Sequence, residues 1–343
     1  MRRWLAVCFT VFFITGIVMS FFPTAAVSKT INWNLSLWSG KRAWTKPVHV
    51  WADAMEKKTN GQWKIKIHYG GVLAPPKENW DGLKAGMFEA AAFCAAYTPG
   101  KIPLHTVQEL PFMAPDGTAN IAKMWIALWE HPAMKKELLK WNAVPLLPAG
   151  HAQFQLMGNK KITKVSDLKG VRIRAGGEIA KVLKEFGAVP TLLPAPEVFE
   201  AIDRGTIDLV AFPYSYAFGS FKVYEVSKYA MDGISLGTMG CAYVANKDAW
   251  DALPDEFKKI HMEWYKQAPQ VWDDEYVAAD KKWIPIFKKN LDLTTFPASE
   301  RAKLVAKAQG IYDKWVAARE KAGLPGKEIL EYYLKKRKEI TGK

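Results

Sequence analysis

The sequence has 343 residues, a formal net charge of +14, and 49% hydrophobic and 13% aromatic residues. This length exceeds one ordinary core, so two domains are expected. The positive charge raises the question of nucleic acid, but the lysines are spread along the whole chain, with the densest run at residues 335–338. We therefore expect no nucleic-acid partner, and infer from the charge only a general preference for anionic ligands.

The N-terminus resembles a secretory signal. Arg2 and Arg3 precede an apolar run over residues 5–22, and small residues follow at 24–28. This order predicts a cleaved signal peptide over residues 1–28 and export to the periplasm. A retained membrane anchor is the alternative, and it is less favoured because the apolar run is near the minimum length that spans a bilayer.

The cysteine and histidine patterns give no sign of a metal, a cofactor or a catalytic residue. The six histidines are not spaced as a zinc pair, and no Cys-x-x-Cys, Gly-x-Ser-x-Gly or phosphate-binding glycine motif is present. Cys94 and Cys241 remain after the signal, each among small apolar residues. That setting predicts two buried thiols without a bridge between them.

The first half of the chain alternates strand and helix patterns. Strands are predicted over residues 30–37, 63–69 and 88–94, because apolar and polar residues alternate or run apolar there. Helices are predicted between them, and again over 121–139, with a loop at 103–112 and a strand at 145–150. The loop after the first strand, at the strand's carboxyl end, has Trp38 and Trp44 on its two sides.

The stretch from residue 167 to 221 predicts a second parallel α/β unit. Strands are predicted at 171–174, 190–193 and 206–212, with helices at 179–186 and 196–202. Such units have right-handed crossovers, and ligands of open α/β sheets bind beyond the carboxyl ends of the strands. Arg174 falls at one of these ends. Further on, the pattern predicts a strand at 238–246, a long helix over 254–290 and a lysine-rich helical C-terminus.

Arg174 stands on a strand that should be buried on both faces, so its charge needs a partner. A ligand carboxylate suits a guanidinium, which can hold it by two parallel hydrogen bonds. A structural acid, Glu178 or Asp208, is the alternative.

Several motifs in this region resemble the solute-binding proteins of TRAP transporters, the DctP-like family. They are Asp-Leu-Lys-Gly-Val-Arg-Ile-Arg at 167–174, Gly-Ala-Val-Pro at 187–190, Glu-Val-Phe at 197–199, Gly-Thr-Ile-Asp at 205–208 and Lys-Val-Tyr-Glu-Val-Ser-Lys-Tyr at 222–229. The resemblance implies a two-lobed α/β periplasmic binding protein with crossing strands and a long helix along both lobes. It assigns residues 29–150 and about 240–280 to the first lobe, and 151–239 and about 281–343 to the second. It also implies that Arg174 binds the substrate carboxylate.

Two departures from the family pattern restrict the class of ligand that we expect. Phe212 stands where many members carry asparagine, and the segment 151–155, where many carry a second arginine, has none. Gln153, Gln155 or His151 would supply a neutral donor there instead. These differences favour a monocarboxylate with an apolar or aromatic body over dicarboxylates.

The site is therefore expected to contain Arg174 as the carboxylate ligand, with Trp38, Phe212 and Tyr214 as walls of the cleft. If dicarboxylates bound tightly, Lys41 or Arg42 of the first loop would have to supply a second cation.

Together these features predict a monomeric periplasmic solute-binding protein that closes on an organic acid and delivers it to a TRAP permease, without enzymatic activity. An adaptor that presents its ligand to a membrane sensor, and a periplasmic enzyme on the same lobes, are the alternatives.

Overall fold

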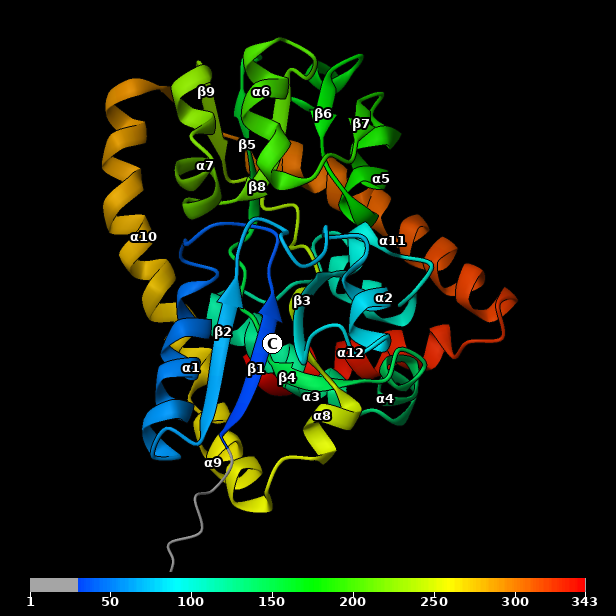
Figure 1. Cartoon of the computed structure of the whole chain (residues 1–343). Coiled ribbons are helices and arrows are strands. Elements are labelled where there is room, and N and C mark those ends of the chain that lie inside the picture. Colours follow the sequence, from blue (N-terminus) through cyan, green and yellow to red (C-terminus); the bar gives the residue numbers. More distant parts are fainter. Residues whose placement is uncertain (1–29, 343) are drawn as a thin grey trace, which may run out of the picture.

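The computed structural model describes residues 30–342, so the predicted signal peptide lies outside the described residues. Its strands form two mixed sheets, one in each of two lobes (Figure 1). The first sheet has the order β2-β1-β3-β10-β4. Its strands are β1 (Ile31–Ser36), β2 (Trp63–His68), β3 (Ala90–Cys94), β4 (Ala143–Leu147) and β10 (Cys241–Asn246).

The second sheet has six strands in the order β11-β9-β5-β8-β6-β7. They are β5 (Phe154–Gly158), β6 (Arg172–Arg174), β7 (Val189–Thr191), β8 (Leu209–Pro213), β9 (Tyr229–Asp232) and β11 (Asp292–Thr295). Ile173 of β6 pairs in parallel with Pro190 on one side and Leu209 on the other. The predicted parallel unit is thus present, with β6 between β7 and β8.

Helices cover both sheets. In the first lobe, α1 (Lys46–Lys58) and α2 (Asn79–Lys84) follow β1 and β2. Alternation along the strands turns Trp33 and Trp63 inward, where their rings meet edge to face at 4.9 Å, and Trp51 of α1 reaches the same cluster. In the second lobe lie α5 (Gly177–Glu185), α6 (Val198–Asp203) and α7 (Tyr216–Ser220).

Two predicted helices are each broken in two. The expected helix over 121–139 consists of α3 (Thr118–Glu130) and α4 (Pro132–Leu139). His131 caps α4 by accepting the Ala133 N–H. Pro132 occupies the first turn, where a backbone N–H would have no partner within the helix, so proline loses no hydrogen bond there. The expected helix over 254–290 likewise consists of α9 (Asp255–Tyr265) and α10 (Ala268–Asn290), after the short α8 (Lys247–Asp251).

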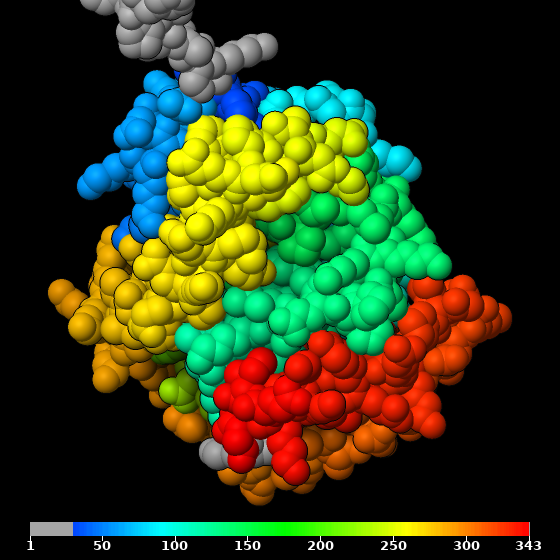
Figure 2. Space-filling view, turned by 90° about the horizontal axis from the view of Figure 1, so that it is seen from below, coloured from blue at the N-terminus to red at the C-terminus, as the bar shows by residue number. Residues whose placement is uncertain are grey.

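The C-terminal helices connect the lobes. Helix α10 contacts α1 and α3 of the first lobe and α7 and β11 of the second, so it runs along both lobes, as the resemblance implied (Figure 1). Helix α11 (Ala298–Lys321) contacts α5, whereas α12 (Gly326–Thr341) returns to α3, as Figure 2 shows from below. We propose the lobe division predicted above, with α12 moved from the second lobe to the first.

None of the helices in residues 30–342 combines the length and the apolar character that crossing a bilayer requires.

A buried carboxyl group lies at the contact between the two lobes. Glu109 lies in the 3-10 helix Leu104–Glu109, in the segment 103–112 that was expected to be loop. Its Oε1 accepts from the backbone N–H groups of Ala96 at 2.8 Å and Gly240 at 3.0 Å, and its Oε2 touches Gly177 of the second lobe. Burial, with a smaller contribution from the nearby Glu178, raises the pKa of Glu109 from 4.5 to about 8, against the lowering effect of its backbone hydrogen bonds and of Arg319.

Glu109→Gln is expected to change how stability depends on pH. A carboxyl whose pKa is raised on folding stabilises the protein fully below its unfolded value of 4.5, and this contribution is lost as the pH rises to about 8. The neutral amide does not titrate, so the difference in melting temperature between variant and wild type should change between pH 5 and 8 and level off above. A constant difference over that range would contradict the raised pKa.

Candidate functional site

Arg174 ends β6, and only 1% of its surface is exposed. Its Nε donates to the carbonyl oxygen of Leu193 at 3.0 Å, and its Nη1 donates to that of Ala211 at 3.3 Å. Both acceptors lie on the chain segments beside β6, so the sheet itself holds the guanidinium in place. The side chain of Tyr97 is a further hydrogen-bond partner of the guanidinium, which leaves the rest of its five N–H groups for another acceptor.

The acids that offered a structural alternative are engaged elsewhere. Asp208 accepts from Nη2 of Arg172 at 2.7 Å, on the exposed side of the strand. Glu178 pairs with Nζ of Lys181 at 2.6 Å. Within residues 30–342 Arg174 has no ion pair, so its buried charge lacks the structural counter-ion that Glu178 or Asp208 would have supplied.

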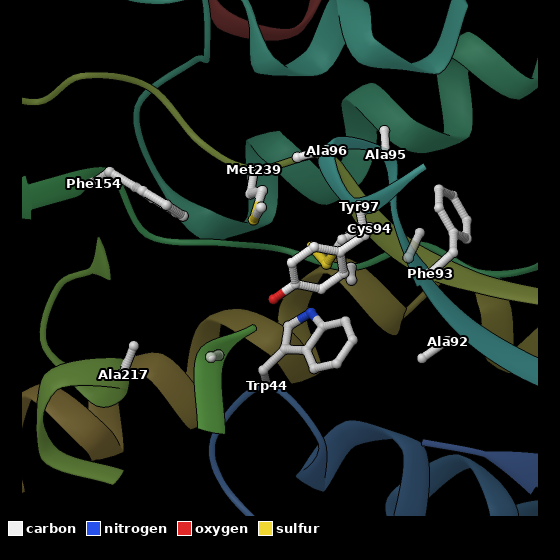
Figure 3. Close-up of a cluster of buried hydrophobic side chains, with 14 of the residues drawn as sticks. Trp44, Ala92, Phe93, Cys94, Ala95, Ala96, Tyr97, Phe154, Ala217 and Met239 are labelled. Atoms are coloured by element: carbon white, nitrogen blue, oxygen red, sulfur yellow. A yellow bond between two sulfur atoms is a disulfide. The ribbon is translucent and has the colours of Figure 1, made fainter. Parts of the chain in front are cut away.

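A cavity lies against Arg174, between the two lobes, with about 360 Å³ of empty space. That figure includes open solvent, and the room for water-sized molecules inside the cavity is about 30 Å³, enough for a water but not for an aromatic acid, so a ligand of that size enters only if the lobes move apart. Seven of its sixteen described lining residues are aromatic: Trp38, Trp44, Tyr97, Phe154, Phe212, Tyr216 and Phe221. The rings contact each other, with centroids 5.7 Å apart for Trp38 and Tyr97 and for Trp38 and Trp44. In Figure 3 the Tyr97 and Trp44 rings stand side by side, and Phe154 and Ala217 lie across from them.

The cavity is electropositive. Among the described residues that line it there are two arginines, Arg42 and Arg174, and no aspartate or glutamate. His151 adds no charge, because burial, assisted by Arg42, lowers its pKa to about 3. Its Nδ1 donates to the carbonyl of Gly150 at 3.0 Å, which leaves Nε2 as an acceptor. His151 is therefore not the neutral donor that the sequence suggested.

Arg174 also stacks on a ring. Its Cζ lies 4.6 Å from the centroid of Phe212, so the phenyl face that replaces the family's asparagine contacts the cation. Burial lowers the pKa of Arg174, while the hydroxyl of Tyr97 raises it. A guanidinium keeps its proton under these influences, so the charge stays in the cavity.

A disulfide forms part of the wall. Cys94 of β3 and Cys241 of β10 are directly paired across the two antiparallel strands and are bonded to each other. The prediction of two unbridged thiols was wrong, because the register of strands far apart in sequence brings the two Cβ atoms together. Figure 3 shows the sulfur atoms beside Tyr97 and Trp44.

The structure brings Arg174, Trp38 and Phe212 together at the cavity, and places the other predicted site residues elsewhere. Gln155 exchanges hydrogen bonds with Ser235, and Gln153 donates to the carbonyl of Ala114 at 3.2 Å. Tyr214 packs against Phe287 of α10. For the two glutamines the reason is local: Phe154 between them lines the cavity, and the chain alternates there, so Gln153 and Gln155 face away.

Sequence reasoning named Arg42 only as a conditional second cation, and it did not name Trp44, Tyr97, Tyr216 or Phe221 among the site residues. Trp44 and Arg42 belong to the loop that follows β1, which the sequence did place at the carboxyl end of a strand. Tyr97 follows β3 in the same way. The signal for them was this shared position, which points at the second lobe once the lobes meet.

These groups can bind an anion. The described lining residues include no lysine, no carboxylate and no free thiol. Elsewhere in residues 30–342, no three His, Cys, Asp or Glu side chains come together as a metal ion would require. A buried cation among rings suits a flat organic acid.

Comparison with known sequences gives relatives that bind organic acids. A monocarboxylate 2-oxoacid-binding periplasmic protein of Nostoc sp. is 28% identical over 236 residues, which cover 65% of this chain and 63% of that protein. A C4-dicarboxylate-binding periplasmic protein of Rhodobacter capsulatus is 28% identical over 212 residues, 60% of this chain and 62% of that protein. The match thus spans less than two thirds of either relative.

Solved structures share the fold over nearly the whole chain. A TRAP solute-binding protein from an unidentified marine microbe, in complex with 3-hydroxybenzoate, is 25% identical, with a TM-score of 0.79 over 91% of this chain and 99% of that one. A TRAP solute-binding protein from Rhodoferax ferrireducens, in complex with benzoate, is 23% identical, with a TM-score of 0.80 over 91% and 99%.

This chain therefore shares its fold with these binding proteins. The family model "Bacterial extracellular solute-binding protein, family 7" matches residues 36–319, most of the chain. The chain belongs to this family of extracellular solute-binding proteins.

Proposed function

We propose that the protein binds an organic acid anion with one carboxylate and an aromatic or apolar body in the cavity between its lobes. The observation that supports this most directly is Arg174, a buried guanidinium without a counter-ion that faces a space walled by rings. A ligand carboxylate provides the missing charge, and a flat body provides the missing contacts. The aromatic acids bound by similar structures agree with this ligand class.

Binding closes the lobes and so exposes a ligand-bound surface to a membrane partner. Because the cavity wall comes from both lobes, a bound acid contacts both and favours the closed state. The partner we propose is a TRAP permease, which receives the acid from a monomeric binding protein. The protein performs no covalent step on its ligand.

The ligand class is tested by competition titration. Benzoate and 3-hydroxybenzoate should each bind more tightly than succinate or malate, because a C4-dicarboxylate offers no ring to the aromatic walls, and the charge of Arg42, the second arginine of the cavity, is already partly balanced by three ring faces. A thermal-shift screen over carboxylic acids precedes the titration, since a ligand of the native state raises the melting temperature. Tight binding of succinate would contradict the proposed class.

Phe212→Asn is expected to weaken binding of an aromatic acid by about 1–3 kcal/mol, because it removes apolar surface from the cavity and the ring face under Arg174. Calorimetry measures the difference. Phe218→Leu is the matched control, since Phe218 packs against Phe212 but does not line the cavity. Equal affinities of Phe212→Asn and wild type would remove the ring from the site.

The mature protein should begin between Val27 and Thr30, after cleavage of residues 1–28 on export. The small residues at 24–28 motivate this position. Intact-mass measurement on protein from the periplasm gives the N-terminus, and a retained Met1 would show that the segment is not a cleaved signal.

A further inference from the structure

Arg42 lies in the loop after β1, and its backbone is held on both sides. Its N–H donates to Oγ1 of Thr45 at 2.9 Å. Its carbonyl oxygen accepts from the N–H groups of Thr45 at 2.9 Å and Lys46 at 3.0 Å. The turn and the start of α1 therefore fix where the Arg42 side chain leaves the loop.

The guanidinium of Arg42 reaches across the cavity wall from the first lobe to the second. Its Cζ lies 5.4 Å from the ring of Trp44 in its own loop. It also lies 4.6 Å from the ring of Phe221 and 5.8 Å from that of Tyr216, at the two ends of α7. Three ring faces thus surround the cation and balance part of its charge.

The rings balance part of the charge of Arg42, but they do not supply a hydrogen-bond acceptor for its N–H groups. Its Nε is buried and has no hydrogen-bond partner, and no ion pair of Arg42 exists in the part of the chain that the structure describes. The acids on its outer side are engaged: Glu275 with Nζ of Lys46 at 2.7 Å, and Glu225 with the hydroxyl of Tyr224 at 3.1 Å. Ring faces do not accept an in-plane N–H, so the missing partner is an oxygen.

We propose that Arg42 donates to a second oxygen of the ligand, a hydroxyl or oxo oxygen, while Arg174 holds the carboxylate. This rests on the proposed function. A neutral oxygen suffices, because the rings already balance part of the charge of Arg42 and what it lacks is an acceptor. The site then selects hydroxy and oxo acids over the acids that lack this oxygen. Since Arg42 and Arg174 belong to different lobes, such an acid also links the lobes.

Calorimetry with two pairs of acids, each differing by one oxygen function, tests this. The pairs are benzoate with 3-hydroxybenzoate, and phenylacetate with phenylglyoxylate. In at least one pair the wild type should bind the oxygenated acid about tenfold more tightly, as expected for a hydrogen bond to a charged group. Arg42→Met keeps the aliphatic stem but removes the donors, so it should bind both members of that pair alike. Arg42→Lys, which keeps a charge, should retain part of the preference and guards against a folding defect.

Lys41→Met is the matched control, because Lys41 carries the same charge next to Arg42 but does not line the cavity. It should keep the full preference. A preference that survives in Arg42→Met, or that is absent from the wild type in both pairs, overturns the role of Arg42 and leaves the proposed function standing. If none of the four acids binds the wild type, the proposed function and this inference both fail. If benzene-1,3-dicarboxylate binds most tightly and loses this in Arg42→Met, the second group is an anion and the hydroxy and oxo class is wrong.

Discussion

Arg174→Ala is expected to abolish binding of aromatic monocarboxylates while the protein stays folded. The guanidinium is the only charged group at the end of β6 that faces the cavity in the described chain, and it is bonded to two carbonyl oxygens rather than to an acid. Losing a desolvated, charge-assisted contact costs about 2–5 kcal/mol of binding free energy, or roughly 30-fold to several thousand-fold in affinity. Calorimetry against benzoate measures the loss.

Two variants sharpen this experiment. Arg174→Lys should bind weakly, because an ammonium group keeps the charge but cannot form the two parallel bonds of the fork. Arg172→Ala, two residues earlier on the same strand, removes an exposed guanidinium paired with Asp208 and should bind as the wild type does. Near-native affinity in Arg174→Ala would exclude Arg174 from the site. An unfolded Arg174→Ala, with Arg172→Ala folded, would make the role of Arg174 structural.

Removal of the disulfide is expected to destabilise the protein strongly. The bond joins Cys94 to Cys241, 147 positions later. A crosslink that closes so long a loop restricts the unfolded chain, and its loss costs about 2–5 kcal/mol. Urea unfolding of the double variant Cys94→Ala with Cys241→Ala should therefore show a clearly lower midpoint than oxidised wild type.

The wild type in reductant is the internal control for this comparison. It should approach the midpoint of the double variant, because both lack the crosslink and both thiols are buried among apolar neighbours. Two reactive thiols in freshly denatured, unreduced periplasmic protein would show that the bond is not formed. An unchanged midpoint in the double variant would mean that the bond contributes nothing to stability.

Periodicity predicted most of the strands and helices, because an element that is buried on one face has apolar residues at regular intervals in its sequence. The run over 63–69 alternates Trp63, Ile65 and Ile67 with lysines, and it forms β2. The strands β9 and β11 were missed for the opposite reason. β11 has four mostly exposed residues at the edge of its sheet, with no apolar alternation to mark it. The breaks in the two long helices were missed although Pro132 and Pro269, in the first turns of α4 and α10, mark the start of a new helix.

Only part of the site could be predicted from the sequence. Arg174 could be found because a charge at the end of a buried strand is unusual in itself. Trp44 and Tyr97 could not be distinguished from core tryptophans and tyrosines, because the sequence around them does not indicate that they will face the second lobe. The disulfide depends on the register of β3 and β10, which are joined by no local pattern. Contacts between lobes are set by the tertiary fold and not by spacing along the chain.

The position of β10 also determines when the strands of the first sheet can pair as the chain is made. β10 lies between β3 and β4, yet it is made after all of β5 to β9. While the second lobe is still being made, β4 has no strand beside it and β3 has one open edge. Open edges of this kind invite pairing with other chains. The sheet that begins first therefore stays incomplete until β10 inserts and Cys94 meets its partner sulfur, and only β11, at the edge of the second sheet, is made later.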